Sequence, residues 1–239
     1  HGMSVLSCMA ADLDGGLIGT APNASYYLLR TEDSYSENLI EEYNWVCGAE
    51  FADSIGVDVI NSSLGYTTFD YSIQNYEYND LDGQTSPSSK AANMAARKGV
   101  IVVNAAGNSG NGNWKYIGAP ADADSILTVG AVDENKEIAS FSSYGPTSDG
   151  RIKPSICAQG KNTEVINFQG NVIKSNGTSF ASPVLAGLVT CLWQAHPTKS
   201  NMEIINAIIQ TSTLYTAPNN HDGYGLANFY RADSLLNSK

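Results

Sequence analysis

The sequence predicts an α/β fold of three layers, in which a mostly parallel sheet carries helices on both faces. Three short apolar runs, 57–62, 100–104 and 126–132, lack polar alternation. Such runs are typical of strands buried on both faces of a parallel sheet. Helical patterns alternate with these runs along the chain, which again indicates βα units. Because 42% of the 239 residues are hydrophobic, we expect one domain with its own core over residues 1–239.

The amino-terminal elements follow from apolar spacing and from glycine. Residues 1–11 carry an apolar stripe among small residues, which predicts a helix. The aromatic and apolar run 24–30 predicts a strand. Residues 33–55 place apolar side chains on one helical face, and Gly56 is positioned to end that helix.

A loop rich in tyrosine and acidic residues, 66–85, follows the first buried strand. It is long for a connection in a compact domain, which indicates a functional or family-specific segment. Ser86 and Pro87 then fit the N-cap and first position of a helix that runs to Lys98. The helix therefore has a defined start, directly after the loop.

Three further elements complete the prediction. Residues 163–174 alternate around a Gln-Gly-Asn turn and predict a hairpin. A helix begins near Ser179 and ends near His196, and Ser200 with Glu203 forms a capping-box pattern for a last helix through Gln210.

Composition excludes some classes of partner. The net charge of −11 and the pI near 4.5 argue against nucleic acid as a main partner. No apolar run is long enough to span a membrane, and no signal peptide is recognisable. The chain opens at His1 without an initiator methionine, so we expect it to be an internal piece of a longer protein.

The four cysteines are far apart in the sequence and have no C-x-x-C spacing, which argues against zinc. Cys8, Cys47 and Cys191 lie among apolar residues of predicted helices, so we expect buried free thiols. One or two disulfides, with Cys157 as a further candidate, remain the alternative.

Ser179 is the candidate nucleophile. It follows a run of small residues and precedes the apolar run 184–193, a pattern that predicts a turn feeding a buried helix. Free backbone N–H groups and the helix dipole at such a position favour a reaction that builds an oxyanion. The alternative is a serine that merely caps a core helix. A G-x-S-x-G nucleophile elbow is excluded, because Ala181 occupies its last position.

Two further residues fit the same chemistry. Of the three histidines, His1 fits best as the general base because it begins a rigid small-residue helix. A surface histidine or the remnant of a cloning tag is the alternative. Asn108 follows a buried strand and can aim its amide N–H at an oxyanion, although Gly-Asn-Ser-Gly also suits a plain turn.

Taken in order, these elements resemble the subtilisin-like serine proteases, the subtilases, over nearly the whole chain. The resemblance is carried by six segments in the family's order: His1 to Val5, Ile60 to Gly65, Ala105 to Asn108, Val129 to Pro146, Gly177 to Pro183, and Gly223 to Asn228. It departs from the family at Met3, Phe180 and Val184, where the family usually has Thr, Met and His. These positions are apolar or lie beside the motif residues, and we expect the changes to be tolerated.

The resemblance implies a serine endopeptidase mechanism on protein or peptide substrates. Ser179 would attack the scissile carbonyl, His1 would move the proton, and Asn108 with the Ser179 N–H would hold the oxyanion. An extended substrate would bind by backbone pairing. The residues implied in substrate binding are Ser63, Leu64, Gly65, Ala105, Ala106 and Gly107, with Gly118 near the base of the pocket for the residue before the cut.

The resemblance also indicates what is missing. In subtilases an aspartate on a central strand precedes the histidine, and no later residue here is a credible replacement; Asp12 and Asp14 follow His1 in the wrong order. We therefore expect an upstream segment to carry that aspartate. We also expect this chain alone to have little or no peptidase activity. Its sheet should close up, swap, or recruit its own amino-terminal segment or a second copy.

The remaining expectations concern ions, alternatives and location. No cofactor is predicted; subtilases often bind calcium, but no ligand is assignable, and the loop around Asp80 and Asp82 is a poor match because Tyr78 takes the first ligand position. The competing functions are a catalytically dead, subtilase-derived binding module and an acidic calcium-binding domain. The resemblance implies a secreted, cell-surface or periplasmic protein.

Overall fold

The protein folds around a four-stranded parallel sheet, and the computed structural model describes residues 1–238. The strands of this sheet lie in the order β1-β2-β3-β4, and β5 and β6 form a separate antiparallel hairpin. The strands are β1 (Val59–Ser62), β2 (Ile101–Ala105), β3 (Leu127–Val132), β4 (Ile156–Gln159), β5 (Thr163–Ile166) and β6 (Val172–Ser175). The helices are α1 (Gly2–Ala10), α2 (Ile40–Ser54), α3 (Pro87–Arg97), α4 (Thr178–Ala195), α5 (Asn201–Gln210) and α6 (Phe229–Asn237).

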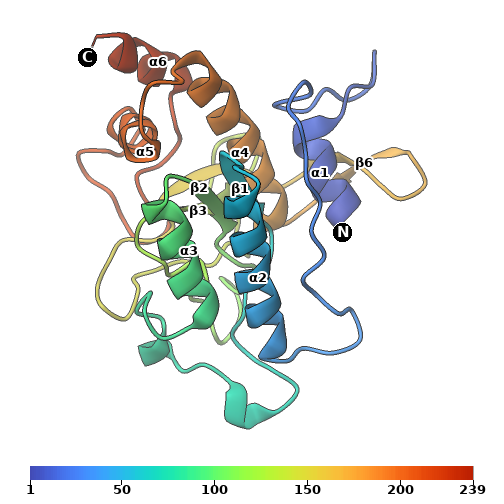
Figure 1. The fold of residues 1–239 in the computed structure, drawn as a ribbon, viewed down its shortest axis with the longest axis vertical. Coiled ribbons are helices and arrows are strands. Elements are labelled where there is room, and N and C mark those ends of the chain that lie inside the picture. Colours follow the sequence, from blue (N-terminus) through green and yellow to red (C-terminus); the bar gives the residue numbers. More distant parts are fainter. Residues whose placement is uncertain (239) are drawn as a thin grey trace.

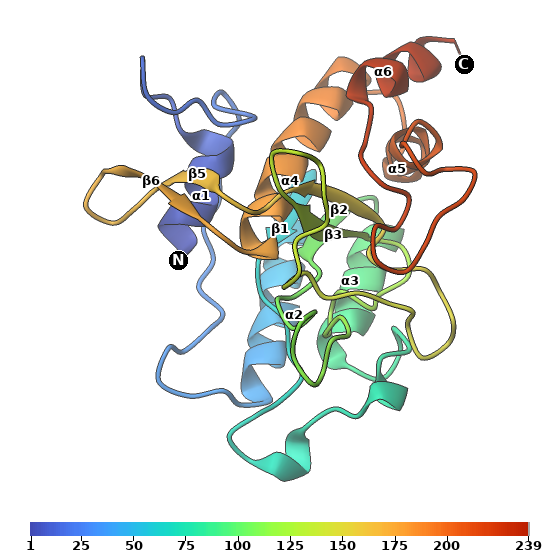
Figure 2. The same ribbon diagram turned by 180° about the vertical axis from the view of Figure 1, so that it is seen from behind.

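Strand β2 shows why the sheet is buried on both faces. Its residues Ile101 and Val103 belong to the core that the sheet shares with α4 and α5. Val102 instead packs with α2 and α3 on the opposite face. Because side chains alternate along a strand, an apolar run without polar alternation is what a sheet between two helical layers requires. Figures 1 and 2 show the two faces, and the predicted three-layer α/β architecture is confirmed.

Local signals set several helix ends as predicted. The Ser86 hydroxyl accepts the Ser89 N–H at the start of α3, and Ser200 and Glu203 form the capping box of α5. Gly56 follows α2 with a φ of 74°, a conformation that glycine adopts without strain. The predicted hairpin over 163–174 is also present, as β5 and β6.

The predicted strand over 24–30 is wrong. The segment forms no ladder with any described strand, and its side chains Tyr27, Leu28 and Leu29 are exposed, Leu28 by 71%. Its neighbour Thr31 is held by a side chain instead, because Asn44 Nδ2 of α2 donates to the Thr31 carbonyl. A strand needs a partner, and sequence pattern alone cannot supply one.

The predicted helix over 33–55 begins seven residues late, at Ile40. The buried carboxylate of Glu41 accepts the backbone N–H groups of Asp33 and Asn38. These bonds wrap the preceding chain around the helix start rather than extending the helix.

Strand β4 and helix α6 were not predicted, although the short apolar run 156–158 was a visible signal for β4.

All four cysteines are free thiols, but only Cys8 and Cys157 are buried. The expectation of burial is wrong for Cys47 and Cys191, which lie on the solvent faces of α2 and α4.

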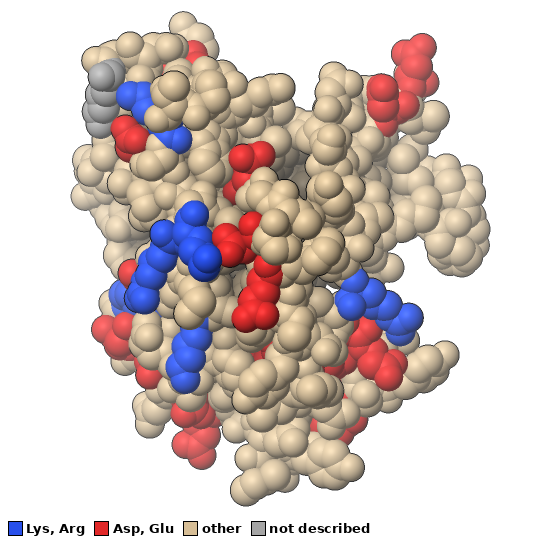
Figure 3. All heavy atoms as spheres, in the orientation of Figure 1, with Lys and Arg blue, Asp and Glu red and all other residues tan. Residues whose placement is uncertain are grey.

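On the face shown in Figure 3, Lys and Arg side chains gather mainly over α3, whereas Asp and Glu side chains are spread more widely. Among the described residues, no helix is both long and apolar enough to cross a bilayer.

Candidate active site

The carboxyl ends of β1 and β2 meet the amino end of α4. The two strands are parallel neighbours, with Ser62 opposite Asn104, so the segments that follow them leave the sheet at the same edge. The Ser63 hydroxyl donates to the Ser179 carbonyl at 2.9 Å and fixes the first segment to the helix start. The three elements therefore converge on one place.

A pocket of about 240 Å³ opens at this convergence. Nine of the ten residues predicted to act or to bind substrate line it; His1 does not. The predicted lining residues are Ser63, Leu64, Gly65, Ala105, Ala106, Gly107, Asn108, Gly118 and Ser179. The structure thus brings together segments that lie more than 100 residues apart in the chain.

Ser179 is half-buried at the second position of α4, and the N-cap is Gly177. The alternative of a capping serine is therefore wrong. At this position the Ser179 backbone N–H has no intrahelical acceptor and remains available to an anion. The Ser179 hydroxyl donates to the Ser63 carbonyl over 3.4 Å, a long hydrogen bond.

Asn108 is oriented by its contacts with Thr178. Its Oδ1 accepts both the Thr178 N–H at 2.9 Å and the Thr178 hydroxyl at 3.1 Å. The same hydroxyl accepts the Gly107 N–H, so the threonine ties the β2 loop to the start of α4. With Oδ1 occupied, the Nδ2 amide, which has no hydrogen bond within residues 1–238, is the group left to donate.

His1 lies beside this helix start without completing a catalytic pair. It is the N-cap of α1, and its ring centroid is 6.1 Å from that of Phe180, the residue after Ser179. Val5 and Cys8 of α1 pack with Phe180 in a small apolar cluster that holds α1 there. Within the described residues the imidazole has no hydrogen bond, either to Ser179 or to a carboxylate.

The other two histidines are committed elsewhere. His196 is buried at the far end of α4, and its Nε2 lies 2.8 Å from Asp233 Oδ1. It lies seventeen positions after Ser179 along the helix, a length of about 26 Å. His221 stacks on Tyr144 with a centroid separation of 4.0 Å. His1 is thus the histidine that packs against the residue next to the serine.

Several lining residues were not predicted from the sequence. Thr67, Ser109, Tyr116, Ser143 and Thr178 also border the pocket. Thr178 had a visible signal, because a threonine between Gly177 and Ser179 can bridge a helix start and a neighbouring loop. The others come from loops whose approach depends on the tertiary fold.

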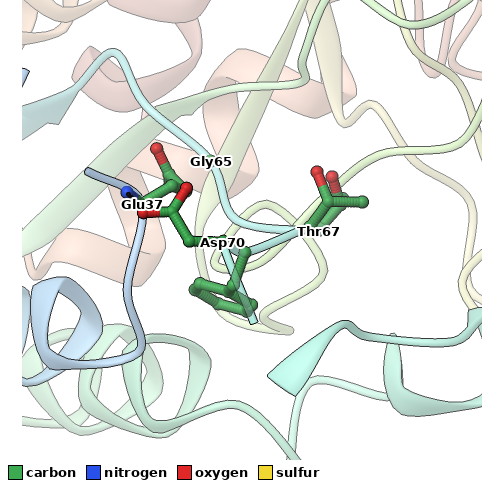
Figure 4. A pocket seen from close by; sticks show the side chains of 6 residues that line it. Glu37, Gly65, Thr67 and Asp70 are labelled. Atoms are coloured by element: carbon green, nitrogen blue, oxygen red, sulfur yellow. Dashed lines mark hydrogen bonds between the residues drawn. The ribbon is translucent and has the colours of Figure 1, made fainter. Parts of the chain in front are cut away.

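A second pocket of about 420 Å³ adjoins the first and was not predicted. It is lined by Glu37, Gly65, Thr67, Thr68, Phe69 and Asp70, and it shares Gly65 and Thr67 with the first pocket. Figure 4 shows Glu37 and Asp70 together on one side and Thr67 on the other. Burial, followed by the negative charges of Glu41, Glu32 and Asp70, raises the pKa of Glu37 to about 7.

The acidic residues of the 66–85 loop are used by local turns. The Asp82 carboxylate accepts the backbone N–H groups of Gln84 and Thr85, and Asp80 accepts that of Glu77.

The carboxylates of Glu32, Glu37 and Glu41 come within 4.8 Å of one another, but those of Glu32 and Glu41 are occupied by hydrogen bonds within the protein. We assign no metal ligand to either group.

Comparisons with a family model, with curated relatives and with solved structures agree with one another. A family model described as the subtilase family matches residues 1–225. Subtilisin DY of Bacillus licheniformis is 35% identical over 215 residues, which are 89% of this chain and 70% of that protein. Subtilisin NAT of Bacillus subtilis subsp. natto is 33% identical over 235 residues, 97% of this chain but only 55% of that protein. The solved structure of the self-cleaved protease domain of PatA matches with a TM-score of 0.80 at 24% identity, covering 100% of this chain and 83% of that one. This structural match supports the fold.

Proposed function

The chain belongs to the subtilase family, and from that membership we propose that it supplies the nucleophile, the base and the oxyanion donors of a serine endopeptidase. One observation carries the proposal. Ser179 and Asn108 both line the pocket at the ends of β1 and β2, and the Asn108 Nδ2 amide forms no hydrogen bond within residues 1–238. That pairing suits acyl transfer, in which attack and charge stabilisation occur at one carbonyl.

In the proposed reaction, Ser179 Oγ attacks the scissile carbonyl while the His1 imidazole accepts its proton. Asn108 Nδ2 and the Ser179 backbone N–H stabilise the oxyanion that forms. The imidazolium then protonates the leaving amine, and water hydrolyses the acyl-enzyme by the reverse sequence. The Ser179 hydroxyl must leave the Ser63 carbonyl for this, and a hydrogen bond of 3.4 Å presents a small barrier.

The substrate would bind as an extended strand. The segments 63–65 and 105–107 flank the pocket. Beyond β1, the backbone groups of Gly65 form no hydrogen bond within residues 1–238. In the second segment the Ala106 N–H and both backbone groups of Gly107 already have partners inside the protein, which leaves the Ala106 carbonyl to pair with substrate. Pairing through the main chain would hold peptides of varied sequence, and the pocket near Gly118 would take the side chain before the cut. A Cβ at Gly118 would lie 2.9 Å from Thr67 Cγ2, so a side chain there would push against the pocket wall.

The proposal includes a strand that carries the third member of the triad, an aspartate, upstream of His1. Two features support it. Strand β1 pairs only with β2 among the described strands, and its residues Val59 to Asn61 remain partly exposed. The His1 imidazole, which needs a carboxylate for its orientation, has no hydrogen-bond partner in residues 1–238. A strand against β1 would cover that edge, and a second copy of the chain is the alternative occupant.

A fluorophosphonate probe tests the proposal directly. At its natural length the protein should be labelled at Ser179, and Ser179→Ala should abolish the labelling. Residues 1–239 alone should be labelled far more slowly and should not turn over peptides. Peptide turnover by purified residues 1–239 that disappears in Ser179→Ala would contradict the need for an added strand.

One observation favours the alternative of a catalytically dead binding module. Ser179 Oγ is hydrogen-bonded to the Ser63 carbonyl rather than to an imidazole. A protein of natural length that is folded and binds peptides, but resists the probe, would establish the module instead. In either case the proposal places the protein outside the cytoplasm, as the resemblance implies, and fractionation of the producing cells checks this location.

A further inference from the structure

The second pocket continues the candidate substrate cleft. Gly65 and Thr67 form part of both walls, so an extended chain that leaves the first pocket along this segment reaches the second. Ser63 is in contact with Ser179, and the chain runs from Ser63 through Gly65 to Thr67. The second pocket therefore lies farther from the nucleophile along the segment proposed to pair with substrate.

Glu37 supplies a carboxylate with no hydrogen-bond donor of its own. Its two acidic neighbours are committed: Glu32 accepts the hydroxyls of Thr31 and Tyr66, and Glu41 accepts two backbone N–H groups. Within residues 1–238 no hydrogen bond reaches the Glu37 carboxylate. It is half-buried, so it bears the cost of lost hydration without a compensating partner.

Asp70 brings a second negative charge to the same wall. Its backbone N–H donates to the Glu37 carbonyl at 2.9 Å, and its Oδ2 accepts the Glu37 N–H at 3.2 Å, so the two residues are held side by side. None of the ion pairs among the described residues includes Glu32, Glu37, Glu41 or Asp70. Arg30 is the cation bonded to this group, and its Nε binds the Glu32 backbone carbonyl instead.

The remaining walls suit a long side chain with a charged tip. Phe69 and the two threonines, Thr67 and Thr68, provide carbon surface beside the carboxylates. A lysine or arginine can lay its methylene stem on such surface while its charge reaches the acids at the end. A neutral or acidic side chain would leave the carboxylates unpaired or add repulsion.

We propose that this second pocket is a specificity subsite for a lysine or arginine of the substrate, on the acyl side of the scissile bond, and that Glu37 and Asp70 set the preference. The inference rests on the proposed function, because it needs a peptide in the adjoining cleft. It adds the chemical class of substrate, a peptide with a basic residue upstream of the cut.

Peptide binding, rather than turnover, tests this subsite. The Ser179→Ala protein of natural length is titrated with fluorescent peptides that carry lysine, norleucine or glutamate at each position in turn, and anisotropy reports binding. At one position upstream of the cut, lysine should bind about fivefold more tightly than norleucine, and glutamate more weakly than both. Higher salt should reduce the lysine advantage.

Matched variants locate the effect. Glu37→Gln and Asp70→Asn should each bring lysine binding close to norleucine binding. Glu50→Gln removes the same charge from an exposed site on α2 that has no hydrogen bond or ion pair within residues 1–238, and it should leave the preference unchanged. The lysine advantage should also grow between pH 6 and pH 8, since the raised pKa of Glu37 keeps part of it protonated at pH 6, and Glu37→Gln should weaken this dependence.

The outcomes distinguish a failure of the proposed subsite from a failure of the proposed peptidase function. Equal binding of lysine and norleucine peptides at every position would overturn the subsite and leave the peptide-binding cleft intact. A lysine preference that survives both Glu37→Gln and Asp70→Asn would also overturn it. If no peptide binds at any position, the proposed function falls together with the subsite.

Discussion

The two halves of the candidate site are built in different ways. Ser179 and Asn108 are held by the sheet and by α4, through Thr178 and through contacts to the buried ends of β1 and β2. His1 stands at the exposed start of α1, which is attached by a small cluster around Val5 and Phe180 and by two side-chain hydrogen bonds to Ile166 of β5. The half proposed to bind the oxyanion is thus held by several hydrogen bonds, whereas the imidazole of the proposed base, His1, forms none within residues 1–238. A site can therefore have firmly held oxyanion donors while its proton acceptor is not yet oriented.

The largest expected effect lies in the rigid half. Asn108→Asp keeps an oxygen for both Thr178 hydrogen bonds but replaces the free amide with a second oxygen. We expect fluorophosphonate labelling of Ser179, in the protein of natural length, to slow by at least the 10²–10³-fold loss of turnover, about 2.7–4 kcal/mol, seen when a subtilisin loses its oxyanion asparagine, a magnitude taken from that relative.

Thr178→Val is the matched change in the same network, because it leaves the Asn108 amide in place but removes the hydroxyl that orients it. Labelling should slow by a smaller factor. Equal labelling rates for Asn108→Asp and the unmodified protein would show that this half of the site is not preorganised for an oxyanion.

A smaller effect is expected on stability inside the sheet half. Lys153 is buried, and its Nζ donates to Thr128 Oγ1 at 3.0 Å. Burial, and then the charge of Arg151, lowers its pKa from 10.5 to about 7. Between these values the unfolded chain binds more protons than the folded one, so the free energy of unfolding should rise with pH by up to about 1.4 kcal/mol per unit.

Lys153→Met should remove this rise, and the exposed Lys90→Met should retain it. Thermal melts of both variants from pH 7 to pH 10 measure the slope. A slope that persists in Lys153→Met would mean that the lysine is not the buried titrating group of this half.

The smallest expected effect compares the two halves directly through their buried thiols. Cys8 lies on α1 and Cys157 on β4, and burial raises the pKa of each thiol, that of Cys8 to about 12. In a protein with Cys47→Ser and Cys191→Ser, which removes the exposed thiols, Cys8 should react with a disulfide reagent about tenfold faster than Cys157. Local opening of α1 would expose the former, and only opening of the sheet would expose the latter. Equal rates would erase the difference between the halves.

The sequence predicted the elements that depend on local residue pattern and missed those that depend on contacts with distant segments. The buried runs at 100–104 and 126–132 became strands because their composition requires two covered faces. The run 24–30 is also mostly apolar but pairs with no strand among residues 1–238. The start of α2 was misplaced because a single carboxylate, that of Glu41, binds the backbone upstream.

The same division holds for the candidate site. Residues that follow predicted strands, such as Gly65 and Ala106, lie where the topology requires, at the carboxyl edge of the sheet. Glu37 lies before a helix and carries no motif, so its approach to Gly65 could not be derived from spacing. The position of His1 beside Phe180 was not predictable either, since it depends on how α1 packs against α4.

The contact between Ser63 and Ser179 joins residues 116 positions apart, and it has a consequence for the order of biosynthesis. A ribosome releases the β1 and β2 segments well before α4, the helix that packs on all four strands of the sheet. Until then the nascent sheet has one apolar face bare, and loop closure over such separations slows folding. Ser179 and its cleft therefore assemble only after α4 has been synthesised, which delays any proteolytic capacity until then.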